Sequence, residues 1–423
     1  MAVPAERRRR TPRRSTTIRG TWTLDDRLTG PVREVEVEIP AGTAALTVRL
    51  AYDRSAGVLD LGCSGPYGFR GWSGGARTEF TVAPQWATPG YLPGEIEAGV
   101  WRVWLGLHRV PLDGLPYEVT VITHVRPPAM PRDHPSRRGR APRSFHPVPA
   151  ATRRDLPTLD GFGWMAGDLH AHTHHSDGSL SVYELACLAA DRGLDFLAVT
   201  DHNTTSHHAE LPAAGALAGI MLVPGQEVTT DLGHANALGS LDWIDFRRPA
   251  REWAKAVQDQ GGVLSVNHPL AADCAWRHPA DVRPRTAELW HWSWWDRTWG
   301  APLAWAQTWA DDLVVVGGGD FHRPEEGHPP GAPTTWVLAD RACDGPEAVV
   351  RAVEDGRTAV SASPDGPLLL RHGEVFLVVG GDGLILWGPE TRTVVRGDRV
   401  ILPARPGVHR LETPSNEVMA LCG

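Results

Sequence analysis

The sequence predicts an α/β protein in which a β/α barrel is flanked on both sides by regions of short β-strands. Apolar runs of four to eight residues alternate with helix-like runs between residues 159 and 363, which indicates a parallel sheet built from βαβ units. Six of the apolar runs end in side chains of the types that bind metal ions. Because a β/α barrel collects its catalytic groups at the carboxyl ends of its strands, we expect these six ends to meet in one site.

Composition limits the class of protein. At 423 residues the chain is expected to form two or three domains, and its 42% hydrophobic and 22% charged residues are ordinary for a globular protein. The formal charge of 42 − 50 = −8 excludes a general attraction to nucleic acid. The five cysteines form no Cys-x-x-Cys pair, which indicates a reducing, cytoplasmic location. Because no stretch approaches the roughly 18 apolar residues of a membrane span, no membrane partner is expected.

The first 19 residues are rich in arginine and lack the apolar segment that a signal peptide needs. Four consecutive arginines occupy positions 7–10, and Pro12, Arg13 and Arg14 follow. We expect a disordered basic arm over residues 1–19, and an arm that binds a polyanion is the alternative.

Residues 20–125 are predicted to form an accessory β-sandwich. Apolar and polar residues alternate over 34–39, 46–50, 101–107 and 119–121, and turns that contain Gly or Pro separate these stretches. No convincing catalytic constellation occurs in this region.

Two further segments lie outside the predicted barrel. Residues 126–158 are expected to be a linker, because positions 126–157 hold eight prolines and eight arginines and few apolar anchors. Residues 364–423 return to short apolar β runs, and we expect them to form a small C-terminal β element.

Within the barrel segment, 159–363, the clearest predicted helix covers residues 182–192. Ser181 and Glu184 have the spacing of a capping box at its start, and Gly193 suits the left-handed position just past its end. The apolar run 196–200 follows directly, which completes a βαβ unit.

Nine imidazole and carboxylate side chains stand at the ends of the six apolar runs or just beyond them. These candidate metal ligands are His170, His172, Asp177, His202, Glu227, His234, His268, Asp320 and His322. His170 and His172 share one face of a strand, since the strand period is two. Imidazoles and carboxylates without thiolates favour Zn, Mn or Fe. Nine ligands exceed the four of one tetrahedral ion, so we expect two or three divalent ions that share a bridging carboxylate.

The chain resembles the polymerase-and-histidinol-phosphatase (PHP) superfamily in an ordered set of motifs. These are Gly167-Asp-Leu-His170-Ala-His172, Thr200-Asp201-His202-Asn203, Asn267-His268-Pro269 and Gly319-Asp320-Phe321-His322. The stretch Gly225-Gln-Glu227-Val-Thr-Thr, with Gly233-His234-Ala-Asn and a Trp-rich segment, resembles the carbaryl-hydrolase-like branch of that superfamily. The resemblance implies a distorted seven-stranded β/α barrel with a site for two or three ions.

By this resemblance the nine side chains divide among three ions. The implied sets are His170, His172, Glu227 and Asp320 for one ion, Glu227, His234 and His268 for a second, and Asp177, His202 and His322 for a third. Phe321 departs from the small residue that the superfamily usually has at this position. Its ring is expected to point away from the site, because successive strand side chains face opposite sides.

These features predict a metal-dependent phosphoesterase. A divalent ion lowers the pKa of its bound water from 15.7 to about 7, and a pair of ions neutralises the oxygens of a phosphoester. We expect His202 or His322 to protonate the leaving group and Arg277 and Arg323 to contact a phosphate. The expected substrate is a nucleotide, an oligonucleotide end or a small phosphomonoester.

Two alternatives stay open. Residues 290–309 hold seven tryptophans (290, 292, 294, 295, 299, 305 and 309), which form either packed core or the wall of an aromatic pocket. A pocket wall would favour a substrate with a flat ring, either a nucleobase or an aryl ester. Together with the branch resemblance, it makes a carboxyl or carbamate ester hydrolase with an aromatic leaving group the first alternative. His291 beside the tryptophans is interpreted as structural. The second alternative is a non-catalytic binding protein with a relict barrel.

Overall fold

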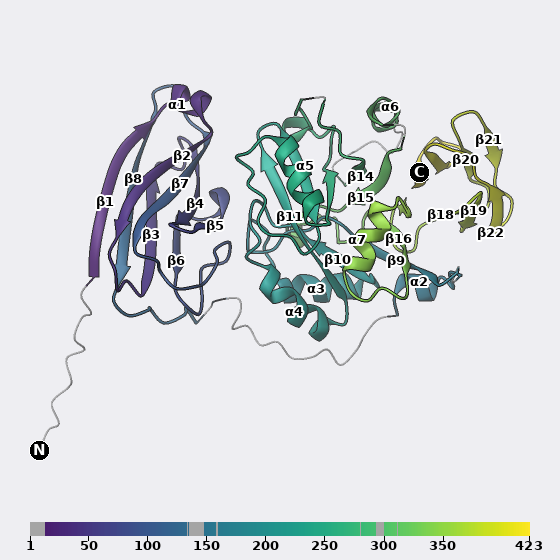
Figure 1. Ribbon diagram of the computed structural model, residues 1–423. Helices are drawn as coiled ribbons and strands as arrows, with labels where there is room; N and C mark the ends of the chain where they lie inside the picture. Colours follow the sequence, from purple (N-terminus) through teal and green to yellow (C-terminus); the bar gives the residue numbers. More distant parts are fainter. Residues whose placement is uncertain are drawn as a thin grey trace, which may run out of the picture. The chain divides into compact units, whose positions relative to one another are not determined.

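The computed structural model describes residues 13–132, 134, 148–157, 160–279, 281–292, 300–310 and 312–423. The chain divides into two compact units, Met1–Arg138 and Gly139–Gly423 (Figure 1). Each unit is built around cores of its own, and the candidate site lies in the second unit.

Two four-stranded antiparallel sheets make up the first unit, with strand orders β1-β8-β3-β6 and β2-β7-β4-β5. Its elements are β1 Arg13–Trp22, α1 Leu24–Thr29, β2 Val32–Ile39, β3 Ala45–Tyr52, β4 Val58–Gly65, β5 Gly68–Trp72, β6 Glu79–Val82, β7 Gly99–Arg109 and β8 Leu115–His124. Val35, Val37 and Ile39 are buried while Glu34, Glu36 and Glu38 are not. This confirms the predicted alternation, because the apolar face of each sheet packs into one shared core.

Strand β1 corrects the prediction of a disordered arm over residues 1–19. It begins at Arg13 and pairs antiparallel with β8, from Arg13 opposite His124 to Trp22 opposite Leu115. The β-branched run Thr16-Thr17-Ile18 favours the extended backbone, and the exposed edge of β8 supplies hydrogen-bond partners. The four-arginine run at 7–10 lies outside the described residues.

Seven strands of the second unit lie next to one another in chain order, from β9 to β15. They are β9 Phe162–Asp168, β10 Phe196–Val199, β11 Met221–Thr230, β12 Gly233–Leu238, β13 Val263–Val266, β14 Thr286–His291 and β15 Val314–Gly318. All neighbouring pairs are parallel except those of β12, which runs antiparallel to β11 and to β13. At the carboxyl ends of β9 and β15, Ala171 and Phe321 form an isolated parallel bridge.

Helices connect several of these strands: α3 Val182–Asp191, α4 Leu211–Ala218, α5 Ala250–Asp259 and α6 Gly300–Trp309. The predicted capping box is present at the start of α3, where Ser181 and Glu184 bond each other's backbone N–H. Gly193 has φ +75°, so the predicted left-handed residue after the helix is confirmed. None of the helices among the described residues is long and apolar enough to cross a membrane.

The C-terminal region is continuous with the main sheet rather than a separate element beginning at residue 364. Strand β16, Thr334–Asp340, pairs antiparallel with β9, and β17, Thr358–Ser361, pairs with β16. After helix α7, Glu347–Glu354, and β17, the last strand β24, Val418–Cys422, pairs with β17. The sheet therefore continues across the predicted boundary, because β24 satisfies the free backbone edge of β17.

The remaining C-terminal strands complete two sheets. β23 His409–Glu412, β20 Ile385–Trp387 and β21 Arg392–Val394 extend the main sheet beyond β24, whereas β18 Leu368–His372, β19 Val375–Val379 and β22 Arg399–Pro403 form a three-stranded sheet. The short helix α2, Ala150–Arg153, packs Ala150 and Ala151 into the core beneath this region. The end of the predicted linker 126–158 is thus part of the second unit, since its small apolar residues reach that core.

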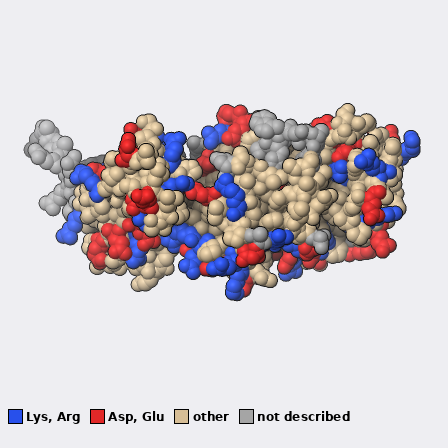
Figure 2. All heavy atoms as spheres, turned by 90° about the horizontal axis from the view of Figure 1, so that it is seen from above, with Lys and Arg blue, Asp and Glu red and all other residues tan. Residues whose placement is uncertain are grey.

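Charged side chains of both signs are distributed over the surface. Figure 2 shows Lys and Arg together with Asp and Glu on the face seen there. The net charge of −8 gives no general attraction to a polyanion.

Candidate metal centre

The candidate ligands stand where the strands of the second unit end. β9 continues into His170 and His172, while the intervening Ala171 packs into the core on the other side. The backbone turns sharply at two of these ends, because His268 has φ +28° and Asp320 has φ +47°. Such left-handed residues are uncommon outside glycine and cluster at functional sites.

Glu227 is the carboxylate at the centre of the site, and its side chain is fully buried. Five imidazoles surround it: its Oε1 lies 3.4 Å from Nε2 of His170, 3.0 Å from Nδ1 of His234 and 3.4 Å from Nε2 of His268, and its Oε2 lies 2.6 Å from Nδ1 of His202 and 3.5 Å from Nε2 of His172. One carboxylate is therefore placed to bridge ions held by different histidines.

Asp320 is the second central carboxylate. Its Oδ1 lies 2.9 Å from Nε2 of His172 and 3.2 Å from Nε2 of His170. Its Oδ2 faces the opposite way and lies 3.3 Å from Nε2 of His291. The ligand atoms of His170, His172 and Asp320 all lie within 4.8 Å of one another, which is compatible with a shared cation.

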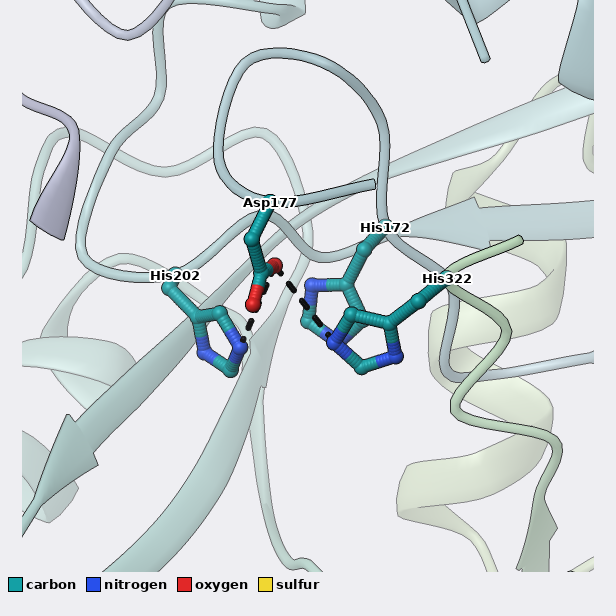
Figure 3. Close-up of side chains that lie close together, drawn as sticks. All are labelled: His172, Asp177, His202 and His322. Carbon is teal, nitrogen blue, oxygen red and sulfur yellow. Dashed lines mark ion pairs between the residues drawn. The ribbon is translucent and has the colours of Figure 1, made fainter. Parts of the chain in front are cut away.

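A third group joins His172 with Asp177, His202 and His322 (Figure 3). Asp177 Oδ1 lies 3.6 Å from Nε2 of His202 and 3.4 Å from Nε2 of His322. The side chains of Asp177, His202 and His322 are 44%, 21% and 17% exposed, whereas that of His172 is fully buried. This group therefore forms the side of the site that is open to solvent.

Burial and charge determine the pKa values of the group. Burial would raise the pKa of Glu227 and of Asp320, but the surrounding histidines hold both pKa values well below their ordinary range. Burial lowers the pKa of His172 to about 4, helped by His322 and His202. At this site, divalent cations would compensate the charge of the carboxylates in place of protonated histidines.

The donor set also fits metal ions in its hydrogen bonding. Among the described residues, Nε2 of His170 is buried without a hydrogen-bond partner, and it faces both Glu227 and Asp320. Its other nitrogen, Nδ1, lies 2.7 Å from Oε1 of Glu288. Because Glu288 accepts from Nδ1, Nε2 is the ring nitrogen that faces the centre, as in a metal-binding histidine.

Neighbouring polar residues hold the ligands in place. Asn267 donates from Nδ2 to Oε1 of Glu227 over 2.8 Å. Asp201 is buried and accepts hydrogen bonds from the backbone N–H and hydroxyl groups of both Thr173 and Ser176. These four bonds fix the loop that ends in Asp177. Asp201 therefore positions the candidate ligand Asp177 and is not itself a candidate ligand.

Two residues of the site, Glu288 and His291, were missed by the sequence analysis. Both belong to β14 and are buried. Oε2 of Glu288 accepts the backbone N–H of His268 over 2.8 Å, which holds the turn at that ligand. His291, which was interpreted as structural, lies in a group with His268 and Asp320 whose ligand atoms are all within 4.8 Å of one another. The sequence signal for Glu288 was its position inside an apolar strand, because a glutamate is rarely buried without a partner.

The two predicted phosphate-binding arginines each contact a residue that is not one of the nine candidate ligands. Arg277 is exposed and donates to the backbone carbonyl of Asp231. Arg323 is 49% exposed, and its Nε lies 3.3 Å from Oε1 of Glu326. Contact of either arginine with a substrate stays a prediction.

The described tryptophans of the 290–309 segment are mostly packed rather than arranged around a pocket. Trp290, Trp305 and Trp309 belong to or contact a hydrophobic core that lies between β14 and α6. Trp292 stacks on His328 with ring centroids 3.9 Å apart. Trp294, Trp295 and Trp299 lie outside the described residues. Core packing is thus the observed role of three of the seven tryptophans.

These overlapping groups of imidazoles and carboxylates, which share Glu227 and Asp320 at the strand ends, form a candidate metal-binding site. No family model matches the chain. The chain is 44% identical over 87 residues to the 3',5'-nucleoside bisphosphate phosphatase of Chromobacterium violaceum. This matched stretch covers 20% of this chain and 29% of the phosphatase. It is 41% identical over 64 residues to the 5'-3' exoribonuclease of Haemophilus influenzae, covering 15% of this chain and 23% of that protein.

Solved structures were also compared. A two-domain protein of Bacteroides vulgatus, described as containing a predicted PHP-like metal-dependent phosphoesterase, has 17% identity and a TM-score of 0.42, covering 67% of this chain and 98% of that chain. An amidohydrolase of Chromobacterium violaceum has 19% identity and a TM-score of 0.28, and the match covers 47% of this chain and 97% of the amidohydrolase. These scores are too low to support a conclusion about the fold.

The similarity in sequence to the bisphosphate phosphatase supports the resemblance to the PHP superfamily. The chain spans less than a third of the length of the phosphatase and of the exoribonuclease that it matches. The finer resemblance to the carbaryl-hydrolase-like branch stays a prediction.

Proposed function

We propose that the protein is a metal-dependent phosphoesterase that hydrolyses a nucleotide, an oligonucleotide end or a small phosphomonoester. The observation that carries this proposal is the pair of central carboxylates, Glu227 and Asp320, each shared by several imidazoles. When bound, two or three divalent ions would supply a hydroxide at neutral pH and neutralise phosphoester oxygens. The similarity to a nucleoside bisphosphate phosphatase and to an exoribonuclease supports the substrate class.

The exposure of the ligands indicates where the substrate would enter. His170, His172 and Glu227 are fully buried, whereas Asp177 and His202 keep exposed surface. We propose that the phosphoester approaches from this exposed side and that the buried ligands fix the ions beneath it.

His322 is a candidate for protonating the leaving group. Burial would lower its pKa, but the carboxylates of Asp177 and Asp320 raise the pKa of His322 to about 8. Its Nδ1 lies 2.8 Å from the backbone carbonyl of Asp320, and it donates to that oxygen. This bond directs Nε2 toward Asp177 at the open side, where a leaving group would lie. His202 is the second candidate, since Asp177 and Glu227 outweigh burial and raise its pKa to about 10.

We further propose that β9 to β15 form a distorted seven-stranded barrel closed at the bridge between Ala171 and Phe321. In this proposal the first unit and the C-terminal strands are accessory, the ions are Mn, Zn or Fe, and the protein acts in the cytoplasm. Elemental analysis of the purified protein would identify the ions and count them.

The other two functions have less support. The ester-hydrolase alternative depended on an aromatic pocket wall, and Trp290, Trp305 and Trp309 pack into or against core. A relict barrel could keep its ligands, so the metal content decides that alternative. Less than one ion per chain, with no activity lost in His170→Ala, would favour the binding protein.

The test is a hydrolysis assay with Mn²⁺ on a panel that holds a nucleoside 3',5'-bisphosphate, a short RNA, a phosphomonoester and 1-naphthyl esters. Release of phosphate or nucleotide by the protein, lost in His170→Ala, would support the proposal. Turnover of naphthyl esters alone would select the ester hydrolase, and inactivity with occupied metal sites would reject both.

A further inference from the structure

The strand β14 carries a bulge that turns two of its side chains to the same side. Glu288 pairs with Val316 but Trp290 pairs with Gly317, so Leu289 is an extra residue on β14. Residues three apart in a regular strand face opposite sides. The extra residue removes this opposition, so Glu288 and His291 both face the candidate site while Leu289 and Trp290 pack into the core behind.

From this geometry we propose that His291 is a metal ligand, which binds a divalent cation together with His268 and the Oδ2 atom of Asp320. The inference rests on the proposed metal-dependent function, but it concerns ion binding rather than the reaction. It adds a ligand beyond the nine candidates named from the sequence.

Distances and burial support this role. Nε2 of His291 lies 3.3 Å from Oδ2 of Asp320, and the ring centroids of His291 and His268 are 4.9 Å apart. The ligand atoms of all three residues lie within 4.8 Å of one another, and the residue His291 is 2% exposed. Because Oδ1 of Asp320 faces His170 and His172, a cation at Oδ2 makes this carboxylate a bridge between two ions.

The competing explanation is that His291 only orients Asp320 through a hydrogen bond. The two explanations differ in the number of ions bound. Loss of a ligand removes or strongly weakens one ion, whereas loss of an outer hydrogen-bond partner weakens metal affinity by roughly 10–100-fold without deleting a site.

The experiment measures ion content and affinity, not activity. Full-length wild type and His291→Ala are stripped with a chelator and titrated with Zn²⁺ and with Co²⁺, and bound metal per chain is then measured by elemental analysis. His328→Ala is the matched control, since His328 stacks on the adjacent Trp292 and occurs in none of the ligand groups among the described residues. Circular dichroism and the melting temperature of the stripped proteins establish that each variant folds, and His291→Gln replaces His291→Ala if the latter does not.

We expect His291→Ala to bind one ion fewer than the wild type, with a changed Co²⁺ absorption spectrum, and His328→Ala to match the wild type. An unchanged ion count in a folded His291 variant would overturn the inference, as would a wild type that binds no ion. If His291→Ala binds one ion fewer than the wild type but the wild type hydrolyses no phosphoester, the inference stands and the proposed function fails. If the wild type hydrolyses phosphoesters and His291→Ala keeps every ion, the proposed function stands and the inference fails.

Discussion

Nδ1 of His170 lies 2.7 Å from Oε1 of Glu288, and both side chains are buried in the second unit. The same glutamate accepts the backbone N–H of His268 through its other oxygen. One carboxylate on β14 thus orients a ligand from β9 and holds the backbone of a second ligand after β13. We therefore expect the candidate metal centre to depend on this contact as well as on its direct ligands.

Replacing Glu288 by Gln tests that dependence. A Gln amide has one acceptor, so either His170 Nδ1 or the backbone N–H of His268 loses its partner. We expect metal affinity to fall by roughly 10–100-fold, measured by competition with a chromophoric chelator. Glu252→Gln on α5, which removes only a surface ion pair with Arg248, is the control. An affinity equal to that of the wild type in Glu288→Gln would refute the orienting role.

Gly318 gives Glu288 the space that it occupies. A Cβ atom at Gly318 would lie 2.0 Å from Oε1 of Glu288. This carboxylate is buried and both of its oxygens are hydrogen-bonded, so a shift that relieves the contact would disturb these bonds. Gly318→Ala is expected to lower the stability of the metal-free protein by about 1–3 kcal/mol and to reduce metal content. The control is Gly300→Ala, where a Cβ meets no atom within 4 Å. Equal melting temperatures for Gly318→Ala and wild type would contradict the packing described.

Asp201 gives the metal-free protein an acid-sensitive element. Burial would raise its pKa, but His207, His175 and the hydrogen bonds of the 173–176 loop lower the pKa of Asp201 from 3.8 to about 2. A pKa that is lower in the folded state contributes stability above the unfolded value of 3.8, and this stability is lost as the pH falls toward 2. The contribution is on the order of 2 kcal/mol.

Asp201→Asn should therefore be less stable than wild type at neutral pH by an amount that shrinks between pH 4 and pH 2. Urea unfolding of the chelator-treated proteins across this pH range provides the measurement. A constant difference between the two proteins at every pH would show that Asp201 acts without its charge. Asp259→Asn, at a surface ion pair with Lys255, serves as the comparison.

Removal of metal should abolish hydrolysis and lower the melting temperature. Glu227 is buried and Asp320 is mostly buried, and among the described residues their ion-pair partners are histidines rather than Lys or Arg. Bound ions would therefore compensate charge that is otherwise costly to bury. Saturation at about 100 times the dissociation constant stabilises the folded state by about 2.7 kcal/mol per site. Differential scanning calorimetry with chelator and with added Mn²⁺ gives the shift. A melting temperature that changes with neither chelator nor Mn²⁺ would argue against a metal site.

Local sequence predicted the parts of the molecule that depend on neighbours along the chain. The helix α3 followed from the capping box of Ser181 and Glu184 and from Gly193, all within one short stretch. The alternation of Val35, Val37 and Ile39 predicted which face of β2 is buried. Errors arose where pairing is distant: β1 begins at Arg13 because β8 covers it, and β24 joins β17 because the sheet has a free edge there.

The sequence alone determined which side chains of the metal centre stand at strand ends, because apolar runs followed by His, Asp or Glu are visible in the order of residues. It did not determine which oxygen faces which imidazole, nor that Glu288 and His291 join the site. Those features depend on an extra residue, Leu289, in the pairing of β14 with β15. Registers between strands are set by packing across the whole sheet, and only the folded chain decides them.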